Sequence, residues 1–286
     1  MHLGVHQLCL FDKWNDARLD YINRLRDWDC DCLDVVLRSI ADYKMAGKIR
    51  KRADSLGLKL NGAGGSLPNS KLILACNPEE RKNALQFMKD MVCMSSELGS
   101  SFYGGVIYAS PGYITGKPVT AEEIGYSIDA IGELARFAQQ YGVRIGLEIV
   151  NRYETYVLNT IEQAIDFINK VGEKNVGIFL DTYHMNIEEK NYLHPITLAD
   201  DRLFHIHLNE SDRGIPGTGN VKWEEVFQGL KAIDYRGTGA IETFPLDLSN
   251  TGILTYTWRN LFQKTEDIFE KGLHFLRNLE HKYGLD

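Results

Sequence analysis

The sequence predicts a single (β/α)8 barrel, or TIM barrel, that spans residues 1–286. Its length of 286 residues is close to the size typical of that fold, roughly 250 residues. Short apolar runs alternate with longer segments of helical period, which is the pattern of βα units around a parallel sheet. No linker rich in Pro, Gly or Ser divides the chain, so one closed barrel is favoured over two small domains or a doubly wound open sheet.

Short apolar runs predict eight strands, and the segments between them carry apolar residues three or four positions apart, as amphipathic helices do. Pro78 and Thr120 are typical residues for the start of a helix. Gly99 and Gly142 stand where the same two helices are expected to end. The last segment, 258–284, is predicted to form one long amphipathic helix. The strands are expected near residues 3–9, 31–37, 58–62, 102–108, 143–148, 176–181, 203–208 and 238–242.

The overall charge makes nucleic acid an unexpected partner. The formal net charge is −7 and the isoelectric point is about 5.7, and such a surface repels phosphate backbones. No apolar stretch approaches the roughly 18 residues that would suggest a membrane span. The N-terminal residues lack the pattern of a signal peptide. We therefore expect a cytoplasmic protein with no nucleic-acid or membrane partner.

The cysteines do not form the framework of a disulfide-rich protein. There are five of them, an odd number, and their spacing fits reduced, buried thiols. Cys30 and Cys32 would share one face of a strand, but no second pair completes a zinc site, so a core role is favoured. The five are Cys9, Cys30, Cys32, Cys76 and Cys93.

Four consecutive predicted strands end in a residue that can bind a metal. In a TIM barrel the carboxyl ends of the strands share one mouth, where active sites are built. Each acid stands in or directly after an apolar run, where a lone carboxylate is costly to bury unless it is paired or bound to a cation. Because the four belong to neighbouring strands, they predict a common metal site. They are Glu148, Asp181, His207 and Glu242.

Three carboxylates and one imidazole form an oxygen-rich ligand set. Such a set suits Mn²⁺, Mg²⁺ or Co²⁺ better than the thiolate-rich sets of structural zinc. A six-coordinate cation would keep two positions for oxygens of a substrate. His205 faces the same side of its strand as His207 but one layer deeper, so we expect it to be a hydrogen-bonded residue that supports the ligands.

Four stretches resemble the ketose 3-epimerases, the group of D-tagatose 3-epimerase and D-allulose (D-psicose) 3-epimerase within the xylose-isomerase-like TIM barrels. The barrel pattern extends this likeness to nearly the whole chain. The combination of NRYET, DTYHMNIEE and DRG followed by PGTG is far more specific than a single carboxylate motif. The stretches are LEIVNRYETYVLNT (147–160), LDTYHMNIEE (180–189), HIHLNESDRGIPGTGNVKW (205–223) and IETF (241–244).

The resemblance implies a role for seven residues. Glu148 and Glu242 would be the catalytic pair, one removing the C3 proton of a ketose and the other returning a proton to the opposite face through an enediolate. The three residues expected to hold the sugar oxygens near C1 to C3 are Glu154, His184 and Arg213. The four expected metal ligands are Glu148, Asp181, His207 and Glu242.

The family also implies the ligands and the assembly. We expect a divalent metal, Mn²⁺ first and Co²⁺ or Mg²⁺ next, no organic cofactor, a small sugar as substrate, and a homodimer or homotetramer. The substrate would be a ketose of the D-tagatose, D-allulose, D-fructose or L-ribulose type. Two regions depart from the family pattern and should shape specificity: HQLCLFDKW near the N-terminus, and Ser110–Gly112, where several epimerases carry a bulky aromatic residue.

Several alternatives remain open from sequence. An inosose dehydratase or isomerase would use the same barrel and metal, an endonuclease-IV-like phosphodiesterase would need a histidine-rich zinc site, and a non-catalytic sugar-binding barrel would not need the glutamate pair. The loop GIPGTG (214–219) is expected to support Arg213, although its backbone N–H groups could also hold a sugar phosphate. NGAGGS (61–66) lacks the spacing of a dinucleotide site and predicts a small-residue loop at the mouth.

Overall fold

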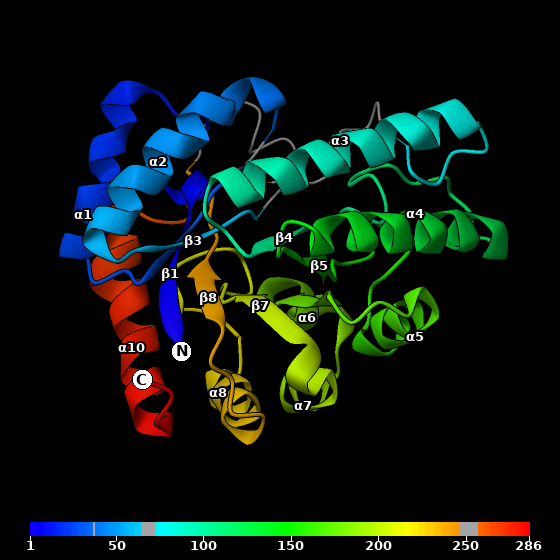
Figure 1. Ribbon diagram of the computed structural model, residues 1–286. Helices are drawn as coiled ribbons and strands as arrows, with labels where there is room; N and C mark the ends of the chain where they lie inside the picture. Colours follow the sequence, from blue (N-terminus) through cyan, green and yellow to red (C-terminus); the bar gives the residue numbers. More distant parts are fainter. Residues whose placement is uncertain (37, 64–71, 246–256) are drawn as a thin grey trace.

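The computed structural model describes residues 1–36, 38–63, 72–245 and 257–286. Its parallel strands form the wall of a barrel, and helices surround that wall (Figure 1). This architecture confirms the predicted TIM barrel. The strands are β1 (His2–His6), β2 (Cys32–Asp34), β3 (Lys59–Asn61), β4 (Phe102–Gly105), β5 (Arg144–Glu148), β6 (Val176–Asp181), β7 (Leu203–His207) and β8 (Thr238–Ile241).

The strands pair in the order β3-β2-β1-β8-β7-β6-β5-β4, and a short bridge joins the two ends of this sheet. At the bridge, Gly62 donates its N–H to the carbonyl of Phe102 at 3.2 Å and accepts from the N–H of Gly104 at 3.1 Å. A Cβ atom on Gly62 would lie 2.2 Å from Oγ of Ser95. The close approach that completes the barrel therefore requires glycine at this position.

The helices begin and end where local sequence signals place them. Pro78 opens α3 behind the N-cap Asn77, and Thr120 caps α4 in a capping box with Glu123. Gly99 and Gly142 follow the two helices with φ of +79° and +65°. The α-helices are α1 (Tyr21–Asp27), α2 (Tyr43–Leu56), α3 (Pro78–Glu97), α4 (Ala121–Gln139), α5 (Ile161–Val171), α6 (Thr182–Glu188), α7 (Leu193–Ala199), α8 (Trp223–Ala232) and α10 (His274–Tyr283). Short helical segments are η1 (Gln7–Cys9), η2 (Asp16–Asp20), η3 (Ile40–Asp42), η4 (Asp200–Arg202) and the π-helical η5 (Ile268–Leu273).

Several predicted elements were too long, among them the strands expected at 31–37 and 102–108, which the structure shows as β2 (Cys32–Asp34) and β4 (Phe102–Gly105). The last helix was predicted to start at residue 258, but helical structure begins only at Glu266. The Asp267 carboxylate accepts the backbone N–H of Lys264 at 3.2 Å, and such a bond competes with the helical ladder. The first strand was predicted to reach residue 9, but β1 ends at His6, because the next three residues turn into η1.

Aromatic rings fill the interior of the barrel. Phe102, Phe179 and Phe204 form a buried cluster with Ala63, separate from the larger core between the strands and the helices. Gly146 on β5 leaves room for one of these rings, because a Cβ there would lie 2.5 Å from the ring of Phe102. The floor beneath the mouth is therefore a packed apolar layer.

The cysteine prediction was wrong for two of the five residues. All are free thiols, and Cys9, Cys30 and Cys32 are buried as expected. Cys76 is exposed because it lies in the turn that precedes α3, and Cys93 is only partly buried.

Within the described ranges, no helix is long and apolar enough to cross a membrane. The predicted loop at 61–66 falls partly outside the described residues.

We predict that Gly146→Ala lowers the free energy of unfolding by about 1–3 kcal/mol, because the new methyl group overpacks the barrel interior against Phe102. Urea denaturation followed by circular dichroism measures this change. Gly125→Ala is the matched control: it lies in α4 with open space around its Cβ, so we expect a gain of roughly 0.5–1 kcal/mol. Equal stabilities for the two variants would contradict the packing argument.

Candidate active site

The four residues predicted at the strand ends come together. Glu148 ends β5, Asp181 ends β6 and His207 ends β7, while Glu242 directly follows β8. Each offers one oxygen or nitrogen atom to a group in which all four atoms lie within 4.8 Å of one another. Parallel strands in register bring their carboxyl ends to one rim, so the sequence order of the four residues becomes an arc around the mouth.

His207 stands at the centre of this group. Its Nδ1 atom lies 3.3 Å from Oε2 of Glu242, and 3.7 Å from both Oε1 of Glu148 and Oδ2 of Asp181. The same Nδ1 atom is buried and has no hydrogen-bond partner among the described residues. Burial alone would lower the pKa of His207, but Glu242, Asp181 and Asp34 raise it well above its usual value. The surroundings of Nδ1 therefore favour a positive charge beside it.

The chemistry of this group fits a divalent cation. With metal–ligand bonds of about 2.1 Å, two ligand atoms on opposite sides of an ion lie about 4.2 Å from each other. This distance agrees with the four atoms of the group, which all lie within 4.8 Å of one another. Three carboxylates and one imidazole, with an imidazole nitrogen that lacks another partner, form the oxygen-rich set that such ions prefer. The two carboxylates that Arg213 contacts, those of Asp181 and Glu242, also share only its single positive charge.

Arg213 links two carboxylates of this arc, those of Asp181 and Glu242. Its Nη1 donates to Oδ2 of Asp181 at 2.7 Å and to Oε2 of Glu242 at 2.8 Å. Burial would raise the pKa of Glu242, but His207 and Arg213 outweigh it and hold that pKa below its usual value. Burial raises the pKa of Glu148, and the nearby Glu242 and Asp181 add to the rise. The two glutamates thus occupy different electrostatic environments at one site.

The three predicted substrate residues border the same group. Nε2 of His184, on α6, lies 3.1 Å from Nη2 of Arg213. Glu154 follows β5, and its Oε1 accepts from Nδ2 of Asn151, which also lies 2.8 Å from Nδ1 of His184. One chain of polar contacts therefore runs from Glu154 through His184 to Arg213. The structure brings all seven predicted residues into one region of the barrel mouth.

The backbone after β7 is arranged to present Arg213. Arg213 has φ of +64°, a left-handed conformation that non-glycine residues rarely adopt. Its N–H donates to the carbonyl of Glu210 at 2.9 Å, and its carbonyl accepts the hydroxyl of Thr243. These bonds fix an unfavourable backbone conformation, which is typical of functional sites.

Comparison with known proteins identifies the family. The model of the xylose isomerase-like TIM barrel matches residues 22–279. The ketose 3-epimerase of Arthrobacter globiformis is 37% identical over 97% of this chain and 96% of its own length. The D-psicose 3-epimerase of Enterocloster bolteae is 31% identical over 96% of this chain and 91% of its own length. The chain belongs to the ketose 3-epimerase group of xylose isomerase-like TIM barrels.

A solved structure supports the same family assignment for this sugar epimerase. The crystal structure of D-allulose 3-epimerase from Methylomonas sp., in complex with D-allulose, superposes with a TM-score of 0.91. It is 30% identical to this chain and covers 97% of it and 96% of the other chain. The likeness extends over the whole barrel, so this chain is an enzyme of the isomerase class.

Sequence reasoning missed several polar residues of the epimerase site. Asp34, at the end of β2, accepts hydrogen bonds from both His205 and His207. Asn209 donates to Oδ2 of Asp181 at 2.8 Å and accepts the N–H of Glu242 at 2.6 Å. Asp34 ends β2, but apolar residues follow it in the sequence, so the strand predicted at 31–37 placed it in mid-strand. Asn209 carries no signal of this kind.

A cavity of about 380 Å³ is lined by residues that follow β1 and β2 and by residues of α2. It borders the segment after β1 that departs from the family pattern: Gln7 and Trp14 line it, and Nε1 of Trp14 donates to Oε1 of Gln7. None of the seven predicted site residues lines this cavity. A role of this segment in specificity therefore stays a prediction.

We predict that Arg213→Met destabilises the enzyme in EDTA by about 3–5 kcal/mol, because Asp181 and Glu242 lose their shared buried partner. Urea denaturation in EDTA measures the effect. Arg259→Met is the matched control, since Arg259 pairs with Asp212 at the surface, and its expected cost is below about 1 kcal/mol. A cost below 1 kcal/mol for Arg213→Met would contradict the assigned role of this cation.

Proposed function

We propose that the enzyme inverts C3 of a free ketose, with Glu148 and Glu242 as the acid–base pair. The observation that carries the proposal is the convergence of Glu148, Asp181, His207 and Glu242 on one group of ligand atoms at the barrel mouth. Family membership and the similarity to named ketose 3-epimerases support it independently. An intact pair of glutamates at the mouth, Glu148 and Glu242, argues against a barrel that only binds sugars.

The four converging residues would hold a divalent cation, Mn²⁺ first and Co²⁺ or Mg²⁺ as alternatives. When bound, such an ion polarises the C2 carbonyl of the ketose and so makes the proton on C3 more acidic. No organic cofactor is required for this chemistry. The observation that best supports a cation among these four residues is the buried Nδ1 of His207, which has no hydrogen-bond partner among the described residues.

The inversion itself is a proton exchange between two glutamates. One glutamate takes the proton from C3, and the electrons of the C–H bond form the C2–C3 double bond of an enediolate. The other glutamate gives a proton to C3 from the opposite face, which restores the C2 carbonyl and inverts the carbon. Glu148 ends β5 and Glu242 follows β8, and β6 and β7 lie between these two strands, so the glutamates would approach a substrate from different sides. Both retain some exposure, which lets the pair exchange protons with water.

Glu154, His184 and Arg213 would hold the sugar oxygens near C1 to C3. His184 and Arg213 are nearly fully buried, and they face the carboxylates rather than bulk water. A guanidinium in that position stabilises negative charge on the enediolate oxygens as it develops. Asn151 positions both Glu154 and His184, so these residues meet the substrate as one arranged set.

The loop after β7 favours a free ketose over a ketose phosphate. The Glu210 carboxylate accepts the N–H groups of Gly217 and Val221, each at 3.0 Å, and that of Ser211 at 2.8 Å. It also accepts Nε1 of Trp223 at 3.1 Å. An internal anion thus occupies donors that a phosphate group would need, and it repels a second anion.

The other rival activities find less support. The two groups of candidate metal ligands in the described parts of the chain contain only His205 and His207 as histidines, which does not suit the multi-zinc site of an endonuclease IV. Inosose dehydration remains the alternative on the same barrel.

The substrate can be identified by incubation with D-tagatose, D-allulose, D-fructose, L-ribulose and an inosose, followed by NMR of the products. Sedimentation measures whether the enzyme forms the homodimer or homotetramer expected from its family.

We predict that Glu148→Gln and Glu242→Gln each reduce kcat by at least about 10²-fold, because each removes one partner of the proton exchange. Conversion of a ketose in D2O, with NMR detection of deuterium at C3, measures turnover and proton exchange together. Glu224→Gln, at an exposed ion pair of α8, is the matched control and should behave as wild type. Wild-type turnover in either active-site variant would refute the two-glutamate mechanism.

We predict that EDTA inactivates the enzyme and that Mn²⁺ or Co²⁺ restores it, because three carboxylates and His207 would hold the cation. The melting temperature should also rise with Mn²⁺ concentration, since a ligand that binds only the folded state stabilises it. Activity and thermal unfolding after dialysis measure both effects. Full activity in a preparation that elemental analysis finds free of metal would exclude the proposed cation site.

A further inference from the structure

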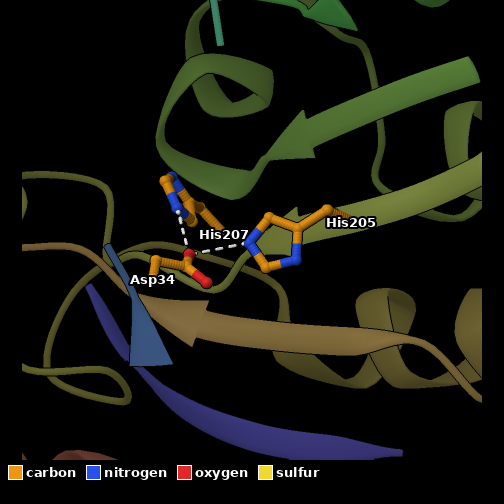
Figure 2. Close-up of side chains that lie close together, drawn as sticks. All are labelled: Asp34, His205 and His207. Carbon is orange, nitrogen blue, oxygen red and sulfur yellow. Dashed lines mark hydrogen bonds and ion pairs between the residues drawn. The ribbon is translucent and has the colours of Figure 1, made fainter. Parts of the chain in front are cut away.

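Asp34 lies between the two histidines of β7, outside the seven residues assigned above. Figure 2 shows the Asp34 carboxylate between the rings of His205 and His207. Its Oδ2 lies 2.8 Å from Nε2 of His205 and 3.0 Å from Nε2 of His207. All three side chains are almost completely buried. A buried carboxylate with two imidazole nitrogens at these distances accepts a hydrogen bond from each.

The other contacts of this network fix the direction of every hydrogen bond. Nδ2 of Asn61, on β3, donates to Oδ1 of Asp34 at 2.7 Å, so both carboxylate oxygens act as acceptors. Nδ1 of His205 lies 2.7 Å from Oγ1 of Thr238. Because Nε2 of His205 carries the proton that Asp34 accepts, its Nδ1 accepts the hydroxyl of Thr238. The network joins β8, β7, β2 and β3.

The network determines which nitrogen of His207 carries a proton. With its Nε2 proton directed at Asp34, the opposite nitrogen, Nδ1, presents a lone pair toward Glu148, Asp181 and Glu242. Nδ1 is also the buried atom of His207 that lacks a hydrogen-bond partner among the described residues. The trio of Asp34, His205 and His207 could be considered as a second metal site. Its contacts are, however, fully accounted for as hydrogen bonds.

We propose that Asp34 is a positioning residue that fixes the tautomer and orientation of His207, so that Nδ1 is the atom that binds the divalent cation. This inference rests on the proposed function, because it presumes the cation site. His205 supports Asp34 from the deeper layer and does not act on the cation. A carboxylate that orients a metal-binding imidazole through its other nitrogen typically changes metal affinity when it is removed.

The test measures binding of Mn²⁺ by electron paramagnetic resonance, with no substrate present. Asp34→Asn keeps the size of the side chain but removes its charge, so its single amide oxygen accepts the N–H of His207 more weakly, and we expect the Kd for Mn²⁺ to rise about 10–100-fold. His205→Gln retains an N–H that can reach Asp34 and leaves the bond to His207 intact, so its Kd should stay within about threefold of wild type. Asp267→Asn, a buried carboxylate outside the network, is the matched control and should bind as wild type.

The outcomes separate this inference from the function on which it rests. Wild-type protein that binds no Mn²⁺ refutes the proposed cation site. Mn²⁺ affinity of wild-type strength in folded Asp34→Asn, or equal losses in the Asp34 and His205 variants, overturns the role of Asp34 alone. Long-range ¹H–¹⁵N NMR of the wild-type, Mg²⁺-loaded protein gives a readout that needs no variant: the His207 proton is expected on Nε2, and a proton on Nδ1 overturns the proposal.

Discussion

The site depends on the balance of charge at the carboxyl ends of β5 to β8. Three carboxylates stand close together in a region with little exposure to water, where repulsion between like charges is only weakly screened. Arg213 offsets part of this charge, and the field around His207 favours a further positive charge. A divalent cation held by the four ligand atoms would supply this further positive charge. The residues around the site hold these carboxylates and His207 close together.

The barrel supplies the geometry that this charge balance requires. Continuous pairing from β5 to β8 brings successive strand ends to one rim, and the aromatic floor of Phe102, Phe179 and Phe204 closes the interior beneath them. The Asn209 amide, which donates to Asp181, and the Asp34 carboxylate, which accepts from His207, then hold individual side chains. The rigid wall therefore sets where each ligand lies, and the buried polar contacts set how it is turned. Both are needed for atoms to meet at metal-binding distances.

Much of the fold and of the ligand set could be predicted because both depend on local periodicity. A strand-end acid such as Glu148 is visible in the sequence as a charge after an apolar run, and the parallel barrel converts four such positions into neighbours. Arg213 could not be found in this way, since its place depends on a left-handed backbone and on contacts with Glu210 and Thr243. Only the family resemblance pointed to it. Asp34 could not be found either, because the apolar Val35 and Val36 that follow it made the predicted strand too long and placed Asp34 inside it.

The bridge at Gly62 has a consequence for the motions of the barrel. Neighbouring strands elsewhere in the wall share several paired residues, whereas β3 and β4 are connected at the described seam by two hydrogen bonds around one glycine. Local opening of a folded protein begins where the fewest interactions must break. The amides of Gly62 and Gly104 should therefore exchange with solvent before those of β5 to β8. The barrel can open locally between β3 and β4 while the half that carries the carboxylates stays closed.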